Sequence, residues 1–128
     1  MSYHFSKTLD VPFDQAVARA TEALKGEGFG VLTDIDIAAT MKAKLGEAFR
    51  PYRILGACNP QLAHRALQLE DKIGTMLPCN VIVQQHANGD VEVSAVDPAA
   101  SMQAIDNPGL TAVAKEVQAR LKRVVDSL

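Results

Sequence analysis

The sequence has no tryptophan, and aromatic residues make up only 5% of its 128 residues. Proteins that bind single-stranded nucleic acid stack bases on aromatic side chains, so this scarcity counts against such a surface. An excess of positive charge is also missing, because the net charge is −2 and the pI is near 5.9. Nucleic-acid-binding domains are usually basic, and we therefore expect no nucleic acid partner.

Long apolar runs are absent as well. No window of 18 apolar residues occurs, so we expect no membrane-spanning helix and no membrane partner. The stretch Met1–Phe5 has neither the basic region nor the apolar run of a secretory signal peptide. Two cysteines in a chain without that signal are typical of a reducing compartment, so we expect a cytoplasmic protein with free thiols.

The common strings of enzymes and nucleotide-binding proteins are also missing. The sequence contains no Gly-x-Gly-x-x-Gly, Walker, Gly-x-Ser-x-Gly or His-Glu-x-x-His string. Its composition is that of a globular protein, with 48% apolar and 22% charged residues, so disorder is not expected. The length predicts one domain over residues 1–128 with its own hydrophobic core.

Apolar periodicity and turn residues predict the secondary structure. Candidate N-caps of the helices are Asp10, Asp36, Asn59, Asp97 and Asn107. The order β-α-β-α-β-α-β-β-α indicates an α/β (α+β) domain in which helices pack on a single mixed sheet. Strands are expected at 3–8, 29–35, 51–58, 79–86 and 91–96, and helices at 12–26, 37–45, 60–70 and from 108 onward, with a short turn over 98–104.

The last two strands are joined at Ala87-Asn88-Gly89. A two-residue Asn-Gly loop would place Gln84 opposite Val93, whereas a three-residue loop with Gly89 left-handed pairs Val83 with Val93. The three-residue loop keeps the valines on one buried face, and a slip by one residue would expose them all. We therefore predict the three-residue loop.

The first candidate site residue is Cys58, where a predicted strand ends and Asn59-Pro60 opens a helix. The positive end of a helix dipole favours a thiolate, which is both a nucleophile and a soft ligand. The alternative is a buried cysteine that acts as a small apolar residue.

Two further candidates are His64 and Cys79. His64 lies opposite the apolar stripe of its helix, so it is either a solvated residue or a ligand that faces a cleft. The Cys-x5-His-x14-Cys spacing is not that of a zinc finger. If the two strands are parallel and joined by a crossover, Cys58 and Cys79 lie at opposite strand ends, unless residues 72–78 run back over the sheet.

Charged residues form two weaker candidates. Asp34 and Asp36 could bind a cation or act as an acid–base pair, although a strand end followed by an N-cap is the more common meaning of such a pair. A cationic group could hold an anion or remain solvated; its members are Lys42, Lys44, Arg50 and Arg53.

Several strings together resemble the bacterial and archaeal domain-of-unknown-function family numbered 302, over about residues 3–125. The most specific strings are Gly56-Ala57-Cys58-Asn59-Pro60, Ala63-His64 and Leu77-Pro78-Cys79-Asn80. The resemblance implies a compact fold similar to that of the TATA-binding protein, and a homodimer. It implies no reaction.

The resemblance adds weight to Cys58, His64 and Cys79 as a functional set, with Asn59 and Asn80 in support. We expect a dimeric binding protein that holds a soft metal ion, haem or a small thiol-reactive ligand, with Cys58, His64 and Cys79 as the metal ligands. The first alternative is an interaction module in which these residues only fix turns, caps and the dimer contact. A thiol or redox enzyme with Cys58 as nucleophile and His64 as base is the less favoured alternative.

Overall fold

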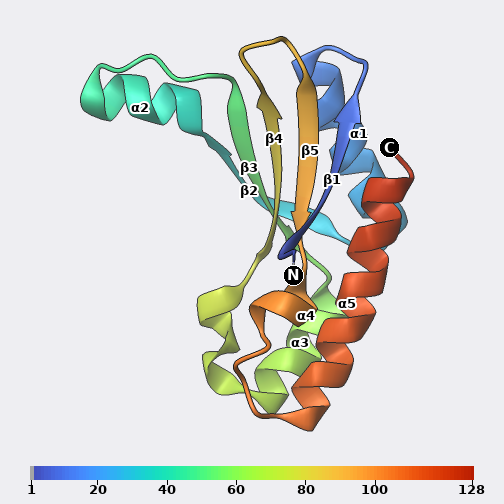
Figure 1. Cartoon of the computed structure of the whole chain (residues 1–128). Coiled ribbons are helices and arrows are strands. Elements are labelled where there is room, and N and C mark those ends of the chain that lie inside the picture. The colour runs from blue at the N-terminus through green and yellow to red at the C-terminus, as the bar shows by residue number, and fades with distance from the viewer. Residues whose placement is uncertain (1) are drawn as a thin grey trace.

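The computed structural model describes residues 2–128. These residues form five strands and five α-helices, and a 3₁₀ segment precedes the fourth strand (Figure 1). In chain order they are β1 (His4–Leu9), α1 (Phe13–Gly26), β2 (Gly30–Asp36), α2 (Ile37–Leu45), β3 (Tyr52–Cys58), α3 (Pro60–Leu69), η1 (Asp71–Met76), β4 (Cys79–Gln85), β5 (Val91–Val96), α4 (Pro98–Ser101) and α5 (Pro108–Asp126). The expected class is confirmed, and most boundaries differ from the prediction by one residue.

The five strands form one sheet in the order β1-β5-β4-β3-β2. Every neighbouring pair is antiparallel, whereas the sequence predicted a mixed sheet. The difference arises at α3 and η1, because this connection returns the chain to the β3 end from which it left. β4 therefore runs back alongside β3 instead of crossing over to lie parallel to it.

Helices α1 and α5 cover one face of the sheet (Figure 1). The buried valines of β4 and β5 lie on that face and pack against the apolar stripe of α5, which the sequence pattern predicted. That stripe is buried at Leu110, Val113, Ala114, Val117, Leu121, Val124 and Val125. Within the described residues, no helix is long and apolar enough to cross a bilayer.

The hairpin between β4 and β5 has the predicted register. Val83 pairs with Val93 and Val81 pairs with Ala95. Gly89 has a φ of 94°, in the left-handed region that the three-residue loop requires. The predicted three-residue loop, which was chosen because it keeps the valines on one buried face, is therefore confirmed.

Four of the five expected caps are present. The side chains of Asp36, Asn59, Asp97 and Asn107 each accept a hydrogen bond from a backbone N–H in the first turn of a helix. Asp10 does not, because α1 begins one residue later than expected and its N-cap is Pro12, which has no side chain that can accept a bond.

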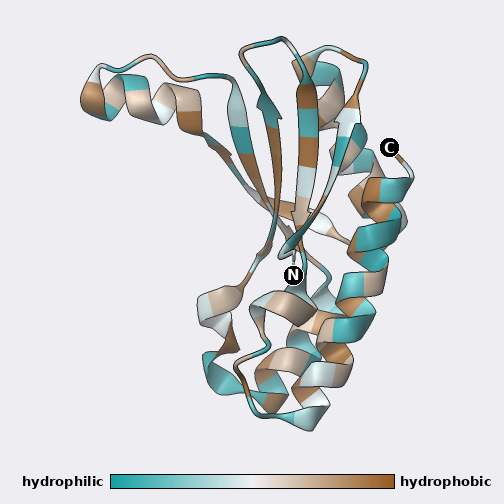
Figure 2. Ribbon diagram, viewed as in Figure 1, coloured by the Kyte–Doolittle hydropathy of each residue, from teal (hydrophilic) through white to brown (hydrophobic). Residues whose placement is uncertain are grey.

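Helix α2 projects beyond the sheet with its flanking strands (Figure 1). None of its nine residues is buried. Figure 2 shows apolar positions at both ends of this helix. Ile37 at its start is half-buried, whereas Leu45 at its end is exposed. We call residues 37–51, which include α2 and the segment that leads to β3, the arm.

Candidate functional site

The antiparallel pairing of β3 with β4 places the two cysteines at the same end of the sheet. Ala57 of β3 lies directly opposite Cys79 of β4, so Cys58 is one residue from the position that faces Cys79. The sequence left open whether the two thiols lie at opposite strand ends, as a parallel crossover requires; the two strands are antiparallel, so both cysteines lie at one end of the strand pair. Both cysteines are free thiols, with Cys58 half-buried and Cys79 buried.

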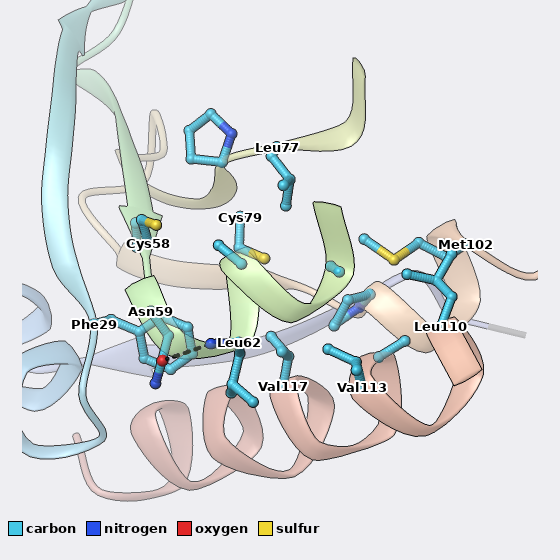
Figure 3. A pocket seen from close by; sticks show the side chains of 16 residues that line it. Phe29, Cys58, Asn59, Leu62, Leu77, Cys79, Met102, Leu110, Val113 and Val117 are labelled. Atoms are coloured by element: carbon cyan, nitrogen blue, oxygen red, sulfur yellow. Dashed lines mark hydrogen bonds between the residues drawn. The ribbon is translucent and has the colours of Figure 1, made fainter. Parts of the chain in front are cut away.

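Cys58 and Cys79 line one cavity of about 40 Å³ between the end of the sheet, α3 and α5 (Figure 3). A third sulfur, that of Met102, lines the same cavity just after α4. The remaining walls are almost entirely apolar, with Phe29, Leu62 and Val117 among them. The residues that line the cavity therefore include two cysteines and one methionine, and few polar groups.

Asn59 follows Cys58 and fixes the start of α3. Its Oδ1 accepts a hydrogen bond of 3.2 Å from the backbone N–H of Leu62, as an N-cap does. Its amide group also lies against Gly28, which has a φ of 85° and where a Cβ would come within 2.9 Å of Nδ2. The Asn59 side chain thus joins the turn after α1 to the wall of the cavity.

The environment of Cys79 opposes ionisation. Burial raises the pKa of its thiol from 9.0 to about 11, and the nearby negative charge of the Cys58 thiolate adds to the rise. At neutral pH Cys79 is a protonated thiol, so it is a poor nucleophile.

Two of the expected site residues lie outside the cavity. His64 is exposed on α3 and does not line the cavity, which agrees with the solvated reading of its helical wheel. Asn80 is also exposed, and it lines a different hollow beside Met76 and Val96. Within residues 2–128, no three His, Cys, Asp or Glu side chains are grouped so as to hold a metal ion. The expected set of Cys58, His64 and Cys79 is therefore not assembled.

The acidic pair on β2 has a structural explanation. Asp34 forms a salt bridge with Arg53 on β3, in which Nε donates to Oδ1 at 2.7 Å. This bond holds the pKa of the Asp34 carboxyl below its usual range. Asp36 caps α2 by accepting from the N–H of Ala39 at 2.9 Å. The pair is a strand end and a helix cap, and we assign it no cation.

The cationic group is dispersed. Arg53 is neutralised by Asp34, and Arg50 lies over the rings of Phe49 and Tyr52 while its Nε donates to Gln84. The two lysines of α2 are exposed on the arm. These residues do not converge on one point, so they form no anion site.

Sequence reasoning missed Met102 and the apolar walls of the cavity. Met102 is 44 residues from Cys58, and no spacing links a methionine in a turn to a distant cysteine. Two X-Pro steps, Leu77-Pro78 and Asp97-Pro98, were the one sequence signal for these walls. Each lies just before residues that line the cavity.

The fold and the cavity together define a small α+β domain with a helix-covered antiparallel sheet and a sulfur-lined internal hollow. The family described as "Domain of unknown function DUF302" matches residues 5–128, and the chain belongs to this family. It is similar to a solved structure described as "uncharacterized conserved protein DUF302 from Bacillus stearothermophilus". The two chains are 31% identical, the alignment covers 98% of each, and the TM-score is 0.91. Among proteins with curated descriptions, none matches this chain.

Proposed function

We propose that this protein binds a soft monovalent metal ion, with Cu(I) as the representative, between the thiolates of Cys58 and Cys79. The observation that carries the proposal is that both cysteines line one apolar cavity at the β3–β4 pair. Thiolates and thioethers are the ligands that select Cu(I) over harder ions. A d¹⁰ monovalent ion is satisfied by two thiolates, so it needs no third protein ligand.

The size of the cavity limits the ligand. Pockets for organic ligands usually measure about 300–1,000 Å³, and this cavity measures about 40 Å³. Haem, one of the expected cofactors, does not fit into that space. A bare ion does, and Met102 supplies a soft neutral group on the cavity wall.

Binding exchanges protons for metal. Each S–H bond releases its proton to solvent and each sulfur forms a bond to the ion, with no change in oxidation state. The resulting centre has a net negative charge in apolar surroundings. The N-terminus of α3, which begins at Pro60 directly after Asn59, directs its positive dipole end toward the Cys58 end of this centre.

The structure gives less support to a thiol enzyme. His64 does not line the cavity and has no contact there that would make it the base for Cys58. The raised pKa of Cys79 also leaves the second thiol unreactive at neutral pH. An interaction module without a ligand is the outcome that a negative metal titration would indicate.

The test is an anaerobic titration of the reduced protein with Cu(I) in competition with a chromophoric Cu(I) chelator. We expect one ion bound per chain, with an ultraviolet thiolate-to-metal absorption band. Affinity should increase with pH, because Cys79 must lose a proton that it holds up to a pH of about 11. Zn²⁺ should bind weakly, since it prefers four ligands.

Three variants make the titration specific. Cys58→Ser and Cys79→Ser should each abolish competitive binding, and far-UV circular dichroism checks that they remain folded. His64→Ala should bind as the native chain does, because His64 lies outside the cavity. If the chelator retains all the copper, or if Cys58→Ser binds as tightly as the native protein, the proposal is wrong.

A further inference from the structure

A second hollow adjoins the cysteine cavity where the chain enters β4. It has a volume of about 230 Å³, and residues before β4 and in and after α4 line it. The exposed residues Met76, Asn80 and Ser101 are among them, so the hollow is open to solvent. Two of the four methionines of the chain, Met76 and Met102, line it. We call this space the outer hollow.

The outer hollow and the cavity share one wall. Four residues line both spaces, namely Pro78, Cys79, Pro98 and Met102. In the segment before β4, Leu77 lines only the cavity and Met76 lines only the outer hollow. Figure 3 shows Leu77, Cys79 and Met102 on the cavity side of this boundary. A ligand that passes the shared wall therefore moves directly from the outer hollow to the cysteines.

The sulfur-bearing residues become less exposed from the outer hollow to the cavity. Met76 is 42% exposed, whereas Met102 is 9% and Cys79 is 7% exposed. Solvent thus reaches Met76 readily and the other two hardly at all. The three side chains place soft ligand atoms at the solvent side of the outer hollow, on the shared wall and at the metal site proposed above.

The chemistry of the outer hollow suits a soft ion before it meets a thiolate. A thioether has no proton to lose, so methionine can bind Cu(I) at any ordinary pH, whereas cysteine must first be deprotonated. None of the residues that line the outer hollow carries a charge. A hydrated hard cation therefore finds no carboxylate there to replace its water, and the outer hollow favours soft ions.

We propose that the outer hollow is the access route of the metal site, and that the thioethers of Met76 and Met102 hold the soft ion before Cys79 receives it. This inference rests on the proposed function. In the transfer, bonds from the ion to the thioether sulfurs break and a bond to the sulfur of Cys79 forms. The S–H proton of Cys79 passes to solvent, and the oxidation state of the ion does not change.

The test compares rates with equilibrium affinity. Anaerobic stopped-flow mixing follows the transfer of Cu(I) from a chromophoric chelator to the protein, and its removal by excess chelator. Met76→Leu should slow both steps by about tenfold and leave the affinity unchanged, because Met76 does not line the cavity. Met41→Leu on α2 is the matched control, since Met41 lines neither space, and it should give the native rates. Far-UV circular dichroism checks that both variants remain folded.

A second measurement observes the thioethers without the thiols. In the Cys58→Ser/Cys79→Ser double variant, Ag(I) should shift the ε-methyl NMR signals of Met76 and Met102 and leave that of Met41 in place. Native rates in Met76→Leu, or a Met76 signal that responds no more than that of Met41, would overturn the access route while the metal site stands. A native chain that binds no Cu(I) at equilibrium would instead overturn the metal site, and the route with it.

Discussion

Cys79 is the residue whose protonation differs most between the folded and unfolded chain. The unfolded thiol titrates near 9.0 and the folded one near 11, because burial disfavours the thiolate. Between these values the unfolded chain binds fewer protons, so the free energy of unfolding decreases as the pH rises through this window. It is unaffected by Cys79 below pH 9, and the total decrease attributable to this thiol is about 2–3 kcal/mol at most.

The measurement is urea unfolding at several pH values from 8 to about 11, for the native chain and for Cys79→Ala. The variant carries all the other titratable groups of the native chain, so the difference between the two curves isolates Cys79. Parallel curves would show that the thiol is not buried as described.

Gly56 is required for a close contact between β2, β3 and the segment before β4. A Cβ at this position would lie 2.7 Å from Cγ of Pro78 and closer still to Oγ1 of Thr33. We expect Gly56→Ala to lower the free energy of unfolding by about 1–3 kcal/mol, the usual cost of overpacking.

Gly30→Ala is the matched control, because a Cβ at this position on the neighbouring strand β2 has no atom within 4 Å. Its effect should be less than about 0.5 kcal/mol in the same urea experiment. If the two alanine variants are equally stable, Pro78 and Thr33 are not packed against Gly56.

At the scale of elements, the cap of α5 also links two helices. Asn107 accepts a bond from the N–H of Leu110, and its Nδ2 donates to the carbonyl of Leu69 at the end of α3 at 2.9 Å. Loss of a helix cap alone costs about 1 kcal/mol of unfolding free energy. Asn107→Ala should cost more than this, because it also removes the bond to Leu69, and the loss is measured as a lower thermal midpoint. Asp10→Ala, at the cap that the structure does not form, should leave the midpoint unchanged.

Local signals predicted the elements well. The cap residues Asp36, Asn59 and Asn107 and the left-handed Gly89 act through contacts within a few residues, so the sequence contains all that is needed to identify them. The strand directions depend on how the chain returns after α3. The 3₁₀ segment η1 makes that return, and no periodicity indicates it.

The candidate site was predicted only in part for the same reason. Cys58 at the junction of a strand and a helix was correct, because that junction is local. The presence of Cys58 and Cys79 along one cavity depends on the antiparallel pairing of their strands. The inclusion of Met102 depends on how the segment after α4 packs. The exposure of His64 follows from its position on the helix opposite the apolar stripe, and the helical pattern had already indicated an exposed residue.

At the scale of the whole molecule, the arm and the core should differ in the free energy of local opening. Amides of α5 and of the central strands β4 and β5 are protected by the core. Amides of α2 lie in a nine-residue helix with no buried residue, and isolated helices of this length are marginal in water. Hydrogen exchange should therefore be faster in α2 than in α5.

Peptide-resolved mass spectrometry separates α2 from β4 and α5 in one experiment. Exchange in α2 that is as slow as exchange in α5 would show that the contacts of this helix with β2 and β3 are enough to hold it folded, and that its lack of buried residues does not lower its local stability.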